Sequence, residues 1–306
     1  MKNVESLRVN NKMLEIAKVD DNNYLVFNVY NNRTIKGNIE VINYFKENPY
    51  VDKDSPVFDF VEKKKPTNIL NFNIFKISID NKYIRGLSSF ANISTNNIIV
   101  SLSLIITLLF IIFSSNLFDF SGAKNINYWF LIIYVYITQI IITALHELSH
   151  FYFYQKNFKT HKTNFGITLR YFFLVLFFTS VPFMNLMNKE NKNNLILAGI
   201  KTQITISGVL CVFSVIFGDY SSNIYFKIVF YYNFFILLTN ALPFFKLDGY
   251  WYISNVLNIN NYMSYYFSMI VRKQKFNLII FLIGTLNIIL IVAFIIYSSY
   301  EIYKLF

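Results

Sequence analysis

The sequence is poor in cysteine, proline, glycine and charge, and each shortage excludes a class of protein. Its 306 residues include one Cys, five Pro and nine Gly. A single cysteine excludes an intramolecular disulfide framework and a thiolate zinc site, and the scarcity of Pro and Gly excludes collagen-like and low-complexity chains. Charged residues make up 15% of the chain, against about 25% in soluble domains. An ordinary water-soluble enzyme is therefore excluded.

Long apolar runs take the place of the missing charge, and 55% of the residues are hydrophobic. Residues 98–118 carry no charge and, at about 1.5 Å per residue, are long enough to cross the roughly 30 Å hydrocarbon core of a bilayer. We predict a mainly α, polytopic membrane protein with about five transmembrane helices, near residues 98–118, 128–154, 202–217, 224–245 and 276–297. The sole cysteine, Cys211, falls in the third run and is interpreted as a small buried hydrophobe.

The basic residues lie around these runs, so the net charge of +11 indicates a lipid bilayer as partner and not a nucleic acid. The connections 155–201 and 246–275 carry seven and four Lys or Arg, whereas 119–127 and 218–223 together carry one. Short cytoplasmic loops collect Lys and Arg. The first residues lack the apolar core of a cleavable signal peptide. We therefore expect a multi-pass protein of the cell membrane with a cytoplasmic N-terminus; its oligomeric state is left open.

The segment HELSH closes the second run and carries His146, Glu147 and His150. Positions i and i+4 of a helix lie on one face, so both imidazoles can point at one metal ion while Glu147 lies beside them as a base. Ionisable groups in an apolar helix are costly unless they are paired or bound. The pattern favours a zinc site with His146 and His150 as ligands; the alternative is a hydrogen-bonded structural cluster.

A catalytic zinc ion usually has three protein ligands. The remaining histidine, His161, lies in a basic loop and is interpreted as a surface residue, and a metzincin would need His where Lys156 stands. Asp248 is the better candidate, within the run NALPFFKLDGYW that begins at Asn240. An Asp-Gly pair alone is typical of a turn. Here it follows the fourth run, on the side of the membrane where HELSH is expected.

The two motifs together resemble the site-2 protease family of intramembrane zinc metalloproteases, in its bacterial peptide zinc metalloprotease branch. The resemblance covers about residues 98–300 and includes N-x-x-P-x-x-x-L-D-G, here Asn240, Pro243, Leu247, Asp248 and Gly249. It implies Zn²⁺ as cofactor, bound by His146, His150 and Asp248, with Glu147 as the catalytic base. Family members often have Pro directly after the Asn, where this chain has Ala241.

Residues 165–184 are apolar enough for a sixth span but contain Arg170 and Pro182. If they crossed the bilayer, Asp248 would lie on the side opposite the histidines, and one ion could not bind all three. We therefore expect a re-entrant or β-hairpin segment with bends at Gly166 and Pro182, and an ordinary span as the alternative. The alternating residues Thr163–Phe172 are expected to form an edge strand that pairs with an extended substrate.

Residues 1–97 are expected to form a small cytoplasmic α+β domain and linker, followed by the membrane domain at 98–306. Tyr24–Tyr30 is predicted as a strand, Asn31 and Asn32 as a turn, and Ile39–Asn48 and Pro56–Lys65 as short helices. The pattern resembles the winged-helix modules that bind precursor peptides. The run Lys63–Lys65 is interpreted as a solvated surface, with contact to anionic lipid as an alternative.

These features predict an intramembrane zinc metalloendopeptidase. Its expected substrate is a small peptide or a single-span membrane protein, cut near the cytoplasmic face, for instance in the maturation of ribosomally made peptides. The alternative is a non-proteolytic membrane component of a peptide export or self-immunity system that retains a zinc site.

Overall fold

The computed structural model describes residues 2–63, 71–114, 117, 127–170, 174–217 and 223–304. The chain is mostly helical, at 60%, with an N-terminal sheet region. It divides into two compact units, Met1–Tyr231 and Tyr232–Phe306, and each is described by itself.

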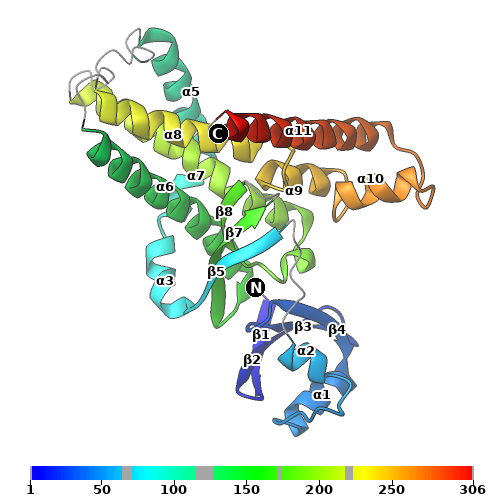
Figure 1. The fold of residues 1–306 in the computed structure, drawn as a ribbon. Helices are drawn as coiled ribbons and strands as arrows, with labels where there is room; N and C mark the ends of the chain where they lie inside the picture. The colour runs from blue at the N-terminus through cyan, green and yellow to red at the C-terminus, as the bar shows by residue number, and fades with distance from the viewer. Residues whose placement is uncertain are drawn as a thin grey trace. The chain divides into compact units, whose positions relative to one another are not determined.

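An antiparallel meander begins the first unit (Figure 1). Its strands β1 to β4 lie in the order β4-β3-β2-β1, and the short strand β6 pairs in parallel with β1 at the far edge. The strands are β1 (Lys2–Val9), β2 (Lys12–Lys18), β3 (Asn23–Asn28), β4 (Arg33–Asn38) and β6 (Phe158–Lys159). Asn10 and Asn11 connect β1 to β2 with φ of 49° and 61°, the left-handed backbone that a two-residue hairpin turn requires.

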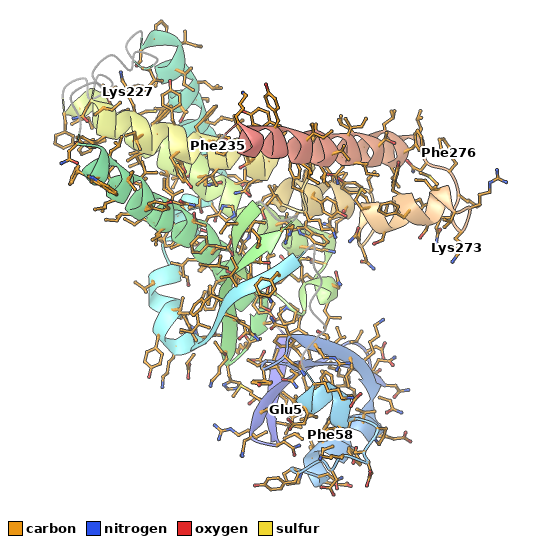
Figure 2. All side chains as sticks on the ribbon, in the orientation of Figure 1. Glu5, Phe58, Lys227, Phe235, Lys273 and Phe276 are labelled. Atoms are coloured by element: carbon orange, nitrogen blue, oxygen red, sulfur yellow. The ribbon has the colours of Figure 1, made fainter. Side chains whose placement is uncertain are left out.

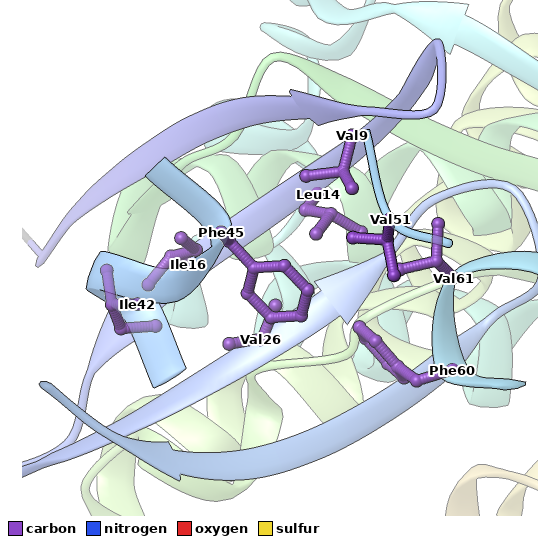
Figure 3. Close-up of a cluster of buried hydrophobic side chains, with 9 residues drawn as sticks. All are labelled: Val9, Leu14, Ile16, Val26, Ile42, Phe45, Val51, Phe60 and Val61. Atoms are coloured by element: carbon purple, nitrogen blue, oxygen red, sulfur yellow. The ribbon is translucent and has the colours of Figure 1, made fainter. Parts of the chain in front are cut away.

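Helices α1 (Ile39–Glu47) and α2 (Phe58–Glu62) complete the core of this sheet. Asn38 caps α1, because its side chain accepts a hydrogen bond from the Val41 amide. The apolar side chains that gather between sheet and helices are Val9, Leu14, Ile16, Val26, Ile42, Phe45, Val51, Phe60 and Val61 (Figure 3).

The structure confirms the strand expected at 24–30, the turn at Asn31 and Asn32, and the helix at 39–48, which appear as β3, a turn and α1. The helix expected at 56–65 is shorter, since α2 ends at Glu62 and Lys63 pairs with Asp59. Lys64 and Lys65 lie outside the described residues. The winged-helix type of this region stays a prediction.

A second sheet of three antiparallel strands has the order β5-β7-β8. Its strands are β5 (Asn71–Asp80), β7 (Lys162–Arg170) and β8 (Leu174–Thr179). The hairpin expected within 165–184 is thus confirmed in the described residues. Because β5 pairs with β7, this sheet joins residues on both sides of the domain boundary expected at residue 97, and that boundary stays a prediction.

Two details predicted for this hairpin are wrong. Gly166 does not bend the chain, because it lies inside β7 opposite Lys76 and Phe178; a Cβ there would meet the Phe75 carbonyl oxygen at 2.3 Å. Glycine is needed for this close approach of neighbouring strands. The segment expected as an edge strand is the central strand β7, so the outer strands are β5 and β8. Pro182 does lie in a turn, after β8.

In the part of the chain that the structure describes, four helices are long and apolar enough to cross a membrane. They are α6 (Tyr128–Asn157), α7 (Lys189–Ile216), α8 (Ile224–Ala241) and α11 (Leu278–Tyr303). The run expected as the first span forms α5 (Asn97–Phe113), which is apolar but shorter. α7 begins well before the expected residue 202, because the Asn188 side chain caps it and it is buried from Leu195 onward. The exact number of spans stays a prediction.

α7 is the central helix of the first unit. In its most apolar stretch 56% of the residues are buried, against 17% in α6 and 22% in α8. α7 packs on both α5 and α6. Gly208 allows α5 to approach closely, because a Cβ there would lie 2.5 Å from Ser103 Cβ. Small residues permit such contacts between membrane helices. Cys211 is fully buried on the same helix, in an apolar cluster with Phe226 and Phe230, as expected. Figure 2 shows Lys227 near the first turn of α8 and Phe235 further along it.

The second unit contains the end of α8 followed by α9 (Asp248–Val256), α10 (Tyr262–Ile270) and α11. Tyr250, Tyr262 and Tyr266 form the centre of its buried cluster. Gly284 of α11 allows the close approach of the Tyr266 ring, because a Cβ there would lie 2.4 Å from Tyr266 Cδ2. The short helices α3 (Asn81–Ser88), α4 (Ala91–Ser94) and the 3-10 turn η3 (Met184–Leu186) belong to the first unit.

Glu15 of β2 ties the meander to the segment that follows α6. Its side chain is 1% exposed, and Oε1 accepts hydrogen bonds from the backbone amides of His161 at 3.0 Å and Lys162 at 3.2 Å. Nearby, Asn164 Nδ2 donates to the Val29 carbonyl oxygen at 2.9 Å. A buried carboxyl therefore holds the two parts of this unit together.

The folded first unit is expected to lose stability as the pH rises, because Glu15 is buried. Burial raises the pKa of the Glu15 carboxyl from 4.5 to about 7, although the two amide hydrogen bonds lower it. A carboxyl with a raised pKa binds its proton more tightly in the folded chain, so the stabilisation is complete below pH 4.5 and is lost as the pH rises through 7, by about 3 kcal/mol. Hydrogen exchange of the His161 and Lys162 amides measures this. The Glu15→Gln variant is the control, and equal pH dependence in both proteins would contradict the prediction.

Candidate metal site

The sequence motif HELSH lies on α6, inside the run that is long enough to cross a membrane. His146 and His150 are 3% and 8% exposed, and Glu147 is half-buried. The potential ligand atoms of the three side chains all lie within 4.8 Å of one another. The structure therefore brings together the three residues that the sequence places in one turn.

The two imidazoles bring their Nε2 atoms together. Their Nε2 atoms are 3.0 Å apart, and the ring planes are inclined at 72°. Two nitrogens that bind one tetrahedral zinc ion at 2.0–2.1 Å are about 3.3 Å apart. The observed separation is within a few tenths of an ångström of that value, so the pair fits a divalent ion.

α7 fixes the orientation of His150. Its Nδ1 lies 2.8 Å from the carbonyl oxygen of Leu195, which can only accept a hydrogen bond. Nδ1 therefore carries the proton, and Nε2 is left with the lone pair that a metal needs. A backbone carbonyl is the kind of partner that metal-binding histidines commonly have on their second nitrogen.

Gly199 makes room for His146. A Cβ at this position would lie 2.2 Å from His146 Cε1 and 2.3 Å from Nε2, far inside van der Waals contact. One turn along α7, Thr202 Oγ1 lies 2.7 Å from Ser149 Oγ on α6 and 3.0 Å from Ser94 Oγ on α4. This hydroxyl chain supports the packing that places the glycine against the ring.

The hairpin reaches the same turn of α6, because Thr179 Oγ1 at the end of β8 donates to the Glu147 carbonyl oxygen at 3.1 Å. That carbonyl belongs to the residue expected to act as base. The three-stranded sheet thus ends beside HELSH.

His161 lies on the turn between β6 and β7 with an exposed side chain, in agreement with its interpretation as a surface residue. Lys156 lies in the last turn of α6. Neither belongs to the group of potential ligands found among the described residues.

Asp248 is the first residue of α9, in the second unit. The chain enters this helix through Phe245 and Lys246, whose φ angles of 58° and 57° are unusual for residues with a Cβ. The next residue is Gly249, where a Cβ would lie 2.3 Å from the Ala241 carbonyl oxygen. Glycine at this position therefore allows the start of α9 to lie close to the end of α8. The approach of Asp248 to the histidines stays a prediction.

Two side chains hold the loop before Asp248. Tyr262 Oη donates to the Pro243 carbonyl oxygen at 2.6 Å, and Asn287 Nδ2 donates to Tyr262 Oη at 3.1 Å. Asn240 lies in the last turn of α8 and is half-buried. This corner thus has a defined shape with Ala241 directly after Asn240.

Sequence reasoning missed the contributions of α7. Leu195 binds His150 through its backbone carbonyl, which every residue has, so the sequence does not indicate this contact. Gly199 was detectable, since an isolated glycine in a helical run often marks a close contact.

Comparison with known proteins adds no family to these observations: no family model matches the chain, and no curated protein or solved structure matches it. The resemblance to site-2 proteases therefore depends on the residues themselves.

Substitution of Gly199 is expected to damage the candidate site. Gly199→Ala pushes the His146 ring out of place and should reduce affinity for added Zn²⁺ by about 10- to 100-fold, the range seen when groups that orient a metal ligand are lost. Equilibrium dialysis of the purified protein against zinc measures this. Gly86→Ala on α3 is the matched control, because a Cβ there meets nothing within 4 Å. Unchanged affinity in Gly199→Ala would show that His146 does not bind the ion.

Proposed function

We propose that this chain is an intramembrane zinc metalloendopeptidase of the site-2 protease type. The observation that carries the proposal is the His146–His150 pair, with Nε2 atoms 3.0 Å apart and Glu147 in the same turn, on a helix that is apolar enough to cross a membrane. The same separation suits a hydrogen bond between the two rings, which is the structural alternative, and the carboxylate of Glu147 beside them favours the metal site. The proposed substrate is a small peptide or a single-span membrane protein, cut near the cytoplasmic face.

His146, His150 and Asp248 would hold the zinc ion, which when bound polarises a peptide carbonyl and makes water more acidic. The shaped loop before Asp248 supports its role as third ligand. Phe245 and Lys246 adopt left-handed backbone at a cost, and such strain is found where the surrounding structure fixes a functional residue.

Glu147 is the proposed general base and acid. It takes a proton from the attacking water as the oxygen bonds to the carbonyl carbon, and it gives the proton to the amine nitrogen as the C–N bond breaks. Its half-buried position beside the imidazoles lets it reach water while the histidines stay enclosed.

An extended substrate is proposed to pair with β8. A helical peptide bond is shielded by its own hydrogen bonds, so a substrate must unwind before it reacts. In the described residues β8 pairs with β7 on one side only, and its last residue Thr179 is bonded to Glu147. Main-chain pairing along β8 would therefore lead an extended peptide toward the base.

Replacement of the base separates proteolysis from the alternative role in peptide export or self-immunity. Glu147→Gln should keep zinc but reduce cleavage by about 10²- to 10⁴-fold, the contribution of a general base. His146→Ala should lose both. The measurements are zinc content and the masses of membrane peptides from cells that express each variant. If Glu147→Gln leaves peptide masses and biological output unchanged, the non-proteolytic alternative is correct.

The role of Asp248 has its own test. Asp248→Asn removes the charge of the proposed third ligand, so the protein should lose zinc more readily to a chelator while α9 stays folded. Asp52→Asn, at an exposed carboxylate of the first unit, is the control. Zinc retention equal to that of the parent protein would exclude Asp248 as a ligand without affecting the assignment of the histidines.

A further inference from the structure

Helix α3 leaves two of its three large apolar side chains exposed. Tyr83 and Leu87, one turn apart, are each 68% exposed, whereas Asn81, Ile84 and Ser88 are buried. α3 packs beside α6 (Figure 1). A helix at a water-exposed surface normally turns its large apolar side chains inward, as α3 does only with Ile84.

The buried side of α3, which holds Ile84 between Asn81 and Ser88, is fixed by hydrogen bonds. Asn81 Nδ2 donates to the carbonyl oxygen of Thr160 at 2.8 Å and to its Oγ1 at 2.9 Å, and the Asn81 amide donates to the His161 carbonyl oxygen at 3.0 Å. Ser88 Oγ donates to the Arg85 carbonyl oxygen at 3.0 Å. The helix therefore cannot rotate to bury Tyr83 and Leu87 without breaking the Asn81 bonds.

Two cations flank the exposed apolar residues. Lys82 and Arg85 are both exposed, and Lys82 Nζ lies 4.8 Å from the centre of the Tyr83 ring. Long basic side chains beside apolar and aromatic ones are typical of helices that lie in a membrane interface, because the stems cover apolar surface while the charges reach the headgroups.

The chain runs from this helix directly into an apolar one. α4 follows with Ile93 64% exposed, and α5 begins at Asn97 with Ile98 71% exposed. In the sequence, the exposed apolar residues of α3 are therefore followed by those of α4 and α5, and the exposed side chains of α5 are almost all apolar.

We propose that α3 lies in the membrane interface, where Lys82 and Arg85 bind anionic lipid headgroups and Tyr83 and Leu87 enter the acyl boundary. The positive charges complement an anionic lipid and would repel a basic peptide. This inference is independent of proteolysis, since it uses none of the residues of the metal site.

Fluorescent labelling of the full chain in vesicles tests the proposal. Cys211→Ala removes the single cysteine, and Leu87→Cys then provides one attachment site for an environment-sensitive dye. Asp21→Cys, whose parent side chain is 99% exposed, gives the matched control. The protein is reconstituted in phosphatidylcholine with and without phosphatidylglycerol. We expect blue-shifted emission at position 87 and several-fold stronger quenching by nitroxide-labelled lipid than at position 21.

The outcomes are distinct. Emission and quenching at position 87 equal to those at position 21 would show that α3 faces water and would overturn the proposal. A blue shift without quenching by lipid would show that protein, such as a second copy of the chain, covers this surface, and would overturn it too.

The charge component is tested separately. Lys82→Glu combined with Arg85→Glu should reduce quenching at position 87 severalfold in vesicles with phosphatidylglycerol and much less in phosphatidylcholine alone. Lys53→Glu, at an exposed position of the first unit, is the control. An equal loss in both lipids would refute headgroup binding by these two residues. Circular dichroism of each variant establishes that it is folded.

Discussion

The close packing of α7 against α6 is the constraint on which the candidate site depends. Gly199 admits the His146 ring, and the Leu195 carbonyl holds the Nδ1 proton of His150. Either contact alone would leave one imidazole free to turn. Together they bring the two Nε2 atoms to 3.0 Å from each other inside an apolar helix, where ionisable groups are costly unless they are paired or bound. The geometry of the motif thus comes from its neighbour as much as from its own spacing.

The sequence predicted those parts of the molecule that follow from local pattern. Apolar runs indicated the four membrane-length helices, and i, i+4 spacing placed His146 and His150 together. Strands β1 and β2 were not predicted, although the Asn10–Asn11 turn between them carries the same signal as Asn31–Asn32. The burial of Glu15 in β2 could not be predicted, because the amides that bond to it lie far along the chain.

Gly166 shows why the strand order was not predictable. The residue was expected at a bend, whereas it lies in the middle of β7 because β5 passes too closely for a side chain. β5 comes from residues 71–80, and nothing in the hairpin itself indicates that such a distant segment covers its edge. Contacts between segments far apart in the chain determine both the role of this glycine and which strands remain at the outside of the sheet.

The parallel pairing of β1 with β6 also limits the order of assembly. Lys2 lies opposite Phe158, so the last strand of the first sheet becomes available only after all of α6 has been synthesised. The buried core of the meander comes entirely from residues 9–61, so the meander can form earlier. Its edge strand β1 stays without β6 until α6, a helix apolar enough to cross a membrane, has been made. Pairing of β1 with β6 is therefore a late step that follows the synthesis of α6, since non-local contacts form slowly compared with local ones.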